Sequence, residues 1–94
     1  MITAEGRVAT PNGGKYVQQL CKHWAHKLTV ELDGDRGVVT FPMGTVTMNG
    51  TPEALQITVT AQEAEQVEQL KNVIASHLDR FAFREAPLSY EWNN

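Results

Sequence analysis

The run LTVELDGDRGVVTFPMGTVTMNGTPEALQITV, residues 28–59, decides the fold, because apolar and polar side chains alternate within it in four short segments. Alternation with a period of two is typical of β-strands that bury one face. The apolar positions are Leu28, Val30 and Leu32, then Val39 and Phe41, then Val46 and Met48, then Leu55, Ile57 and Val59. Turn-forming residues separate the segments, at residues 33–37, 41–44 and 49–52. The run therefore predicts consecutive strands joined by hairpins.

The flanking segments complete the list of elements. Residues 2–9 alternate like a further strand. Thr10-Pro11-Asn12 is typical of a helix start and predicts a helix from about residue 12 to 27. Residues 60–63, TAQE, resemble a capping box and predict a second helix. Leu88, Tyr90 and Trp92 alternate with polar residues and predict a closing strand.

The element order β-α-β-β-β-β-α-β predicts an α+β fold. The economical packing is a two-layer sandwich, in which a mainly antiparallel sheet carries both helices on one face. A length of 94 residues suits a single domain over residues 1–94. The other face of the sheet is rich in threonine and faces either water or a second subunit, so a homodimer is left open.

Composition excludes several classes of function. The formal charge of −3 disfavours nucleic acid as a partner. The single cysteine cannot form an intrachain disulfide, which favours a reducing, cytoplasmic location. The N-terminus lacks the pattern of a signal peptide, and no apolar segment approaches the ~18 residues of a membrane span. We therefore expect no membrane association.

The stretch QLCKHWAHK, residues 19–27, is the strongest candidate for a site. It holds the only cysteine, two of the three histidines and one of the two tryptophans. No Asp or Glu occurs between Glu5 and Glu31, so this part of an acidic chain is locally basic. A basic surface with an apolar wall suits a small anionic ligand or an acidic protein partner. The candidate binding residues are Lys22, His23, Trp24, His26 and Lys27.

A metal site is the alternative for the same stretch. His23 and His26 are three residues apart, so on a helix they are neighbours. His77, on the second predicted helix, could complete a triangle suited to zinc, copper or iron, or a haem site. The helix dipole also favours cations near a helix C-terminus, which explains these histidines and lysines without any cofactor.

No catalytic residue is assigned. Cys21 lies beside the apolar stripe of the first predicted helix, which predicts a buried and unreactive thiol. A nucleophilic cysteine also needs a base within hydrogen-bond reach. A non-enzymatic role is therefore expected rather than catalysis.

Three segments carry a resemblance to a known family: residues 7–10, RVAT; residues 19–27 with Tyr16; and residues 77–85, HLDRFAFRE. Together they resemble the domain of unknown function family 2218, small bacterial domains to which no reaction, cofactor or ligand is assigned. The resemblance also implies an association with siderophore-interacting flavoproteins and hence with iron use. We therefore expect a binding or interaction module that uses the basic, histidine-rich helix surface, with a metal- or haem-binding protein tied to iron and siderophores as the alternative.

Overall fold

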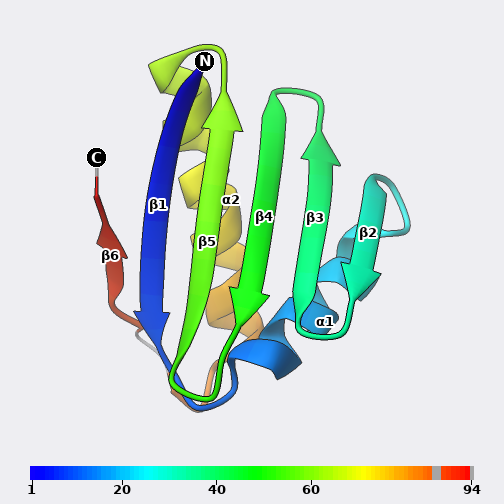
Figure 1. Cartoon of the computed structure of the whole chain (residues 1–94), viewed down its shortest axis with the longest axis vertical. Helices are drawn as coiled ribbons and strands as arrows, with labels where there is room; N and C mark the ends of the chain where they lie inside the picture. The colour runs from blue at the N-terminus through cyan, green and yellow to red at the C-terminus, as the bar shows by residue number, and fades with distance from the viewer. Residues whose placement is uncertain (86–87, 94) are drawn as a thin grey trace.

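The computed structural model describes residues 1–85 and 88–93, and its elements follow the predicted order (Figure 1). The elements are β1 (Ile2–Ala9), α1 (Gly13–Trp24), β2 (Thr29–Asp33), β3 (Arg36–Phe41), β4 (Gly44–Gly50), β5 (Ala54–Ala61), α2 (Ala64–Phe81) and β6 (Tyr90–Trp92).

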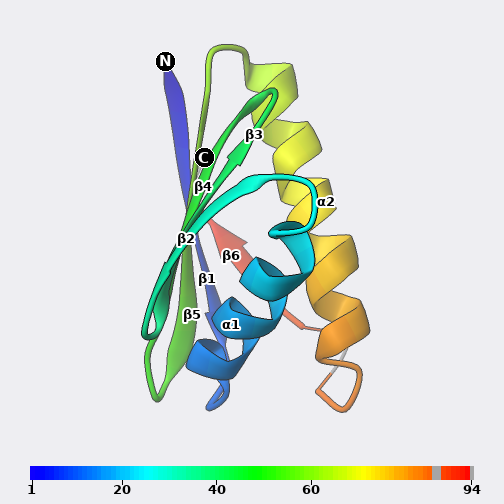
Figure 2. The same cartoon turned by 90° about the vertical axis from the view of Figure 1, so that its right-hand side faces the viewer.

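The sheet has six strands in the order β2-β3-β4-β5-β1-β6, and each neighbouring pair is antiparallel. Both helices lie on the same face of this sheet (Figure 2). The two-layer α+β sandwich is therefore confirmed. Neither helix in the described part of the chain is long and apolar enough to cross a membrane.

The core lies between the sheet and the helices, where the alternating apolar residues of the strands point. Val46 and Met48 of β4 are fully buried there, against Leu20 of α1 and Leu70 and Ile74 of α2. Burying one such side chain contributes roughly 1.5–3 kcal/mol, so this shared apolar face holds the two layers together.

The opposite face carries threonines in register. Five threonines pair with one another in a row that crosses five strands, from β2 to β1: Thr29, Thr40, Thr45, Thr60 and Thr3. The predicted threonine-rich outer face is therefore present, and the homodimer that could cover it stays a prediction.

The first helix ends earlier than predicted, at Trp24 rather than at residue 27. The amide of Lys27 donates to the carbonyl of Trp24, which tightens the chain into a turn after the helix. This turn leads Leu28 and Thr29 into the sheet. His26 and Lys27 therefore lie in a turn and not on a helical face.

The predicted capping box at residues 60–63 was wrong by one turn. Thr60 lies in β5, paired with Thr45 of β4 and Thr3 of β1, because pairing in the sheet extends the strand to Ala61. The helix is capped at Glu63 instead, whose amide donates to Oε1 of Gln66 over 3.1 Å.

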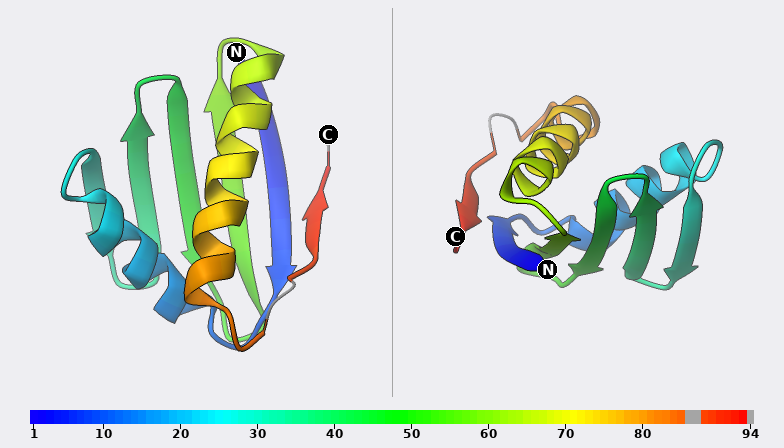
Figure 3. Two further views of the ribbon diagram at one scale, coloured as in Figure 1. Left: turned by 180° about the vertical axis from the view of Figure 1, so that it is seen from behind. Right: turned by 90° about the horizontal axis from the view of Figure 1, so that it is seen from above.

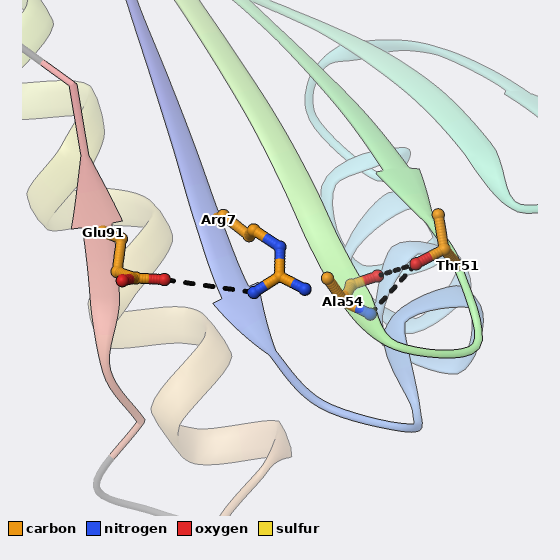
Figure 4. Close-up of polar contacts among 4 residues, drawn as sticks. All are labelled: Arg7, Thr51, Ala54 and Glu91. Atoms are coloured by element: carbon orange, nitrogen blue, oxygen red, sulfur yellow. Dashed lines mark hydrogen bonds and ion pairs between the residues drawn. The ribbon is translucent and has the colours of Figure 1, made fainter.

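Close contact between backbones fixes where α1 begins. A Cβ atom at Gly50 would lie 2.2 Å from the amide nitrogen of Gly14. The β4–β5 turn beneath it is closed by Thr51, whose hydroxyl donates to the Ala54 carbonyl and accepts from the Ala54 amide (Figure 4). The start of α1 therefore lies directly against this hydrogen-bonded turn.

Figure 4 also shows Arg7 of β1 facing Glu91 of β6, with an ion pair at 3.9 Å.

Candidate functional site

The two helices lie close together near the end of α2 and diverge toward the end of α1 (Figure 3). Between the diverging parts lies a cavity of about 420 Å³, which we call the aromatic cavity. Its lining residues are His23, Trp24, His26, Lys27, Leu28, Phe41 and His77. A second hollow of about 260 Å³, the side cavity, shares His23 and His77 and adds Arg80 and Phe81.

Three elements position these side chains. His23 and Trp24 come from the last turn of α1, and Phe41 ends β3. His77, Arg80 and Phe81 are three and four residues apart on α2, a spacing that places them on one face of the helix. Packing of both helices on the sheet brings these separate segments together.

The walls of the cavity are aromatic rings in mutual contact. The ring centroid of Trp24 lies 5.2 Å from that of Phe41 and 5.4 Å from that of His77. His23 lies 5.1 Å from His77 and 5.8 Å from Phe81. These separations are typical of favourable aromatic pairs, worth roughly 0.5–1.5 kcal/mol each beyond burial. Five rings therefore form one continuous and preorganised surface.

His77 has a defined hydrogen-bonding state. Its Nδ1 lies 2.8 Å from the carbonyl oxygen of Val73, which can only accept a hydrogen bond. Nδ1 therefore carries a hydrogen, and in the neutral ring Nε2 is an acceptor. The His77 side chain is half-buried and lines the aromatic cavity.

The rim of the site is positively charged. Lys27 borders the aromatic cavity and Arg80 borders the side cavity, and both residues are exposed. Among the described residues that line the two cavities there is no carboxylate. A ligand in this site therefore meets apolar rings inside and cations at the edge.

The structure brings most of the predicted site residues together. His23, Trp24, His26 and Lys27 all line the aromatic cavity, whereas Lys22 is exposed on α1 and does not line it. Sequence reasoning missed Leu28, Phe41, Arg80 and Phe81. The spacing of Arg80 and Phe81 from His77 was a usable signal, while nothing in the sequence near Phe41 places it beside Trp24.

The predicted metal triangle of His23, His26 and His77 is not formed as a metal-holding group. Within residues 1–85 and 88–93, no three His, Cys, Asp or Glu side chains gather in an arrangement that could hold a metal ion. The cause is the early end of α1, because His26 follows in the turn instead of lying one helical turn beyond His23. The expectation of zinc, copper, iron or haem gains no support from this geometry.

Cys21 is buried, as predicted, with 1% of its surface exposed. Burial raises the pKa of its thiol. A Cβ atom added at Gly37 of β3 would lie 2.4 Å from its sulfur, so the thiol packs directly onto the sheet. Its role is packing between α1 and the sheet.

A carboxylate outside the aromatic cavity links the segment after α2 to the start of α1. Glu85 accepts hydrogen bonds from Thr10 at 2.7 Å, from the amide group of Asn12 at 3.0 Å and from the hydroxyl of Tyr16. We call these four residues the Glu85 latch. The bond from Tyr16 is the largest cause that lowers the pKa of Glu85. Burial, followed by the bond to Glu85, raises the pKa of Tyr16 to about 12.

Comparison with known proteins supports the fold and the family resemblance. A family model described as "Uncharacterized protein conserved in bacteria (DUF2218)" matches residues 5–93. The solved NMR structure of PA4090 from Pseudomonas aeruginosa is similar, with 30% sequence identity and a TM-score of 0.85. The similarity covers 99% of this chain and 96% of that one. No curated protein matches the chain.

Proposed function

We propose that this chain, which belongs to the DUF2218 family of uncharacterised bacterial proteins, binds a small organic anion with a flat apolar body in the aromatic cavity. One observation carries the proposal: contacting aromatic rings line a hollow whose rim bears cations and, among the described residues, no carboxylate. The role is that of a binding module, without a chemical step.

The apolar part of the site can supply most of the affinity. The aromatic cavity, at about 420 Å³, has the size of a small-molecule site, which is typically lined by apolar and aromatic side chains with few polar groups. Each Å² of apolar surface that a ligand buries there contributes roughly 25 cal/mol. A flat ring can also stack on His23 or His77, which are more exposed than Trp24 and are held in place by their neighbours.

The cations supply the preference for negative charge. Lys27 lines the aromatic cavity and Arg80 lines the side cavity. Surface charges steer and orient a ligand more than they hold it, and salt weakens their effect. We therefore expect affinity to fall moderately with ionic strength, while the apolar contribution persists.

The test uses 1-anilinonaphthalene-8-sulfonate, which has flat apolar rings and one sulfonate, titrated into the folded protein and followed by its fluorescence. Trp24→Leu is expected to weaken binding about 10-fold, which corresponds to about 1.4 kcal/mol. The pair Lys27→Gln and Arg80→Gln is expected to weaken it several-fold. The matched control is the double variant Lys22→Gln and Arg36→Gln, which removes the same charge from exposed residues outside both cavities.

Two results would overturn the proposal. One is unchanged binding in Trp24→Leu when circular dichroism shows that the variant is folded. The other is an equal loss in the Lys22 and Arg36 control and in the Lys27 and Arg80 variant, because the dye would then follow overall charge and not this site.

A further inference from the structure

A third cavity lies at the other end of α1, between the start of α1 and the segment after α2, and has a volume of about 360 Å³. We call it the polar cavity. The residues that matter for its chemistry are Lys15, Gln19, Phe83, Arg84 and Glu85. It is distinct from the aromatic cavity and touches the side cavity only through Phe81.

The charge of the polar cavity is not balanced by contacts within the protein. Lys15 and Arg84 both line it, against the single carboxylate of Glu85. Both oxygens of that carboxylate accept hydrogen bonds from other residues of the Glu85 latch. In the described part of the chain, neither Lys15 nor Arg84 has a carboxylate oxygen within 4 Å. With two positive charges against one negative charge, the cavity keeps an excess of positive charge for an incoming anion, although Lys15 also acts electrostatically on Glu85.

An aromatic ring stands exposed beside these cations. Phe83 exposes 69% of its surface, although an apolar ring of this size gains from being covered. The guanidinium of Arg84 lies 5.7 Å from its centroid. A ligand ring stacked on Phe83 would thus lie next to the positive charge.

A glutamine supplies an unused hydrogen-bonding group. Gln19 lines the polar cavity, and its Oε1 is buried without a hydrogen-bond partner among the described residues. Buried side-chain oxygens are usually paired, so this one is an exception that a donor would correct.

We infer that the polar cavity is a second binding site, which takes the phosphate monoester of a ring compound. The phosphate meets Lys15 and Arg84, and the ring stacks on Phe83. Phosphate fits better than a carboxylate, because a monoester carries nearly two negative charges at neutral pH and presents three acceptor oxygens to the two cationic side chains. This inference does not depend on the ligand proposed for the aromatic cavity.

The test is a titration of the folded protein with inorganic phosphate and with phenyl phosphate, followed by the backbone amide signals in NMR. Phenyl phosphate is expected to shift the amides of residues 12–19 and 82–85 and to bind about 5-fold more tightly than inorganic phosphate. Phe83→Ala should remove that difference. The double variant Lys15→Gln and Arg84→Gln should weaken both ligands about 10-fold or more.

The matched control is the double variant Lys22→Gln and Arg36→Gln, which removes the same charge from exposed residues outside the polar cavity. It should bind both ligands as the parent does. An equal loss in the control, shifts centred on other residues, no shift with either ligand, or no effect of Phe83→Ala would each overturn the inference.

Discussion

Tyr16→Phe tests whether the Glu85 latch stabilises the fold. The substitution removes one hydroxyl that donates to a carboxylate and keeps the buried ring. A hydrogen bond to a charged group contributes roughly 1.5–3 kcal/mol. Because Glu85 is only half-buried, we expect the lower limit, a loss of about 1.5 kcal/mol in the free energy of unfolding. In a domain of this size that lowers Tm by about 6–12 °C.

The loss should depend on pH in a defined direction. The folded state lowers the pKa of Glu85, so its contribution is present above the unfolded-state pKa, about 4.3, and is lost as pH falls through the folded-state pKa. The folded state raises the pKa of Tyr16 from its ordinary value near 10 to about 12. That contribution is present below about pH 10 and is lost as pH rises through 12. The effect of Tyr16→Phe should therefore be largest near neutral pH.

The assay is urea unfolding followed by circular dichroism at pH 7 and at pH 3, for Tyr16→Phe, Glu85→Gln and the double variant. A double-mutant cycle isolates the interaction between the two residues, which we expect to be about 1 kcal/mol at pH 7. Tyr90→Phe is the control, because the Tyr90 hydroxyl donates to Asp79 and should add independently to Glu85→Gln. Unchanged stability of Tyr16→Phe at pH 7 would refute the reasoning, and so would a loss that does not decrease as pH falls through the folded-state pKa of Glu85.

Two further predictions concern the contact between α1 and the sheet. Gly37→Ala places a methyl group against the Cys21 sulfur and should lower the free energy of unfolding by about 1–3 kcal/mol. Adding Cys21→Ala should recover part of that loss. Urea titrations of the single and double variants test this, and no recovery would mean that the strain does not arise at the Cys21 sulfur. The Cys21 thiol should react with Ellman's reagent only as fast as the protein opens, because burial raises its pKa and excludes the reagent; reaction at the rate of the unfolded chain would contradict the buried position.

Most of the candidate site that could be predicted consists of neighbours in the chain, and His77 was the one distant residue expected beside His23. His23 and Trp24 were found because the stretch from residue 19 to 27 is unusual in composition. Phe41 comes from β3 and Arg80 comes from α2. Neither could be assigned to the site from the sequence, because only the packing of the helices on the sheet brings them near His23 and Trp24. The metal triangle gains no support for a related reason, since it assumed a helix that continues to His26.

The sequence by itself determined the type and order of the elements. Alternation over residues 28–59 and the turn residues between its segments depend on near neighbours, so they can be read locally. Only the tertiary structure decided that β1 lies between β5 and β6 and that α1 stops at Trp24. The place of β1 and the end of α1 both follow from burial of one shared apolar face. Strand pairing and packing of the helices on the sheet involve residues distant in the sequence, and they outweigh the local helix and strand propensities.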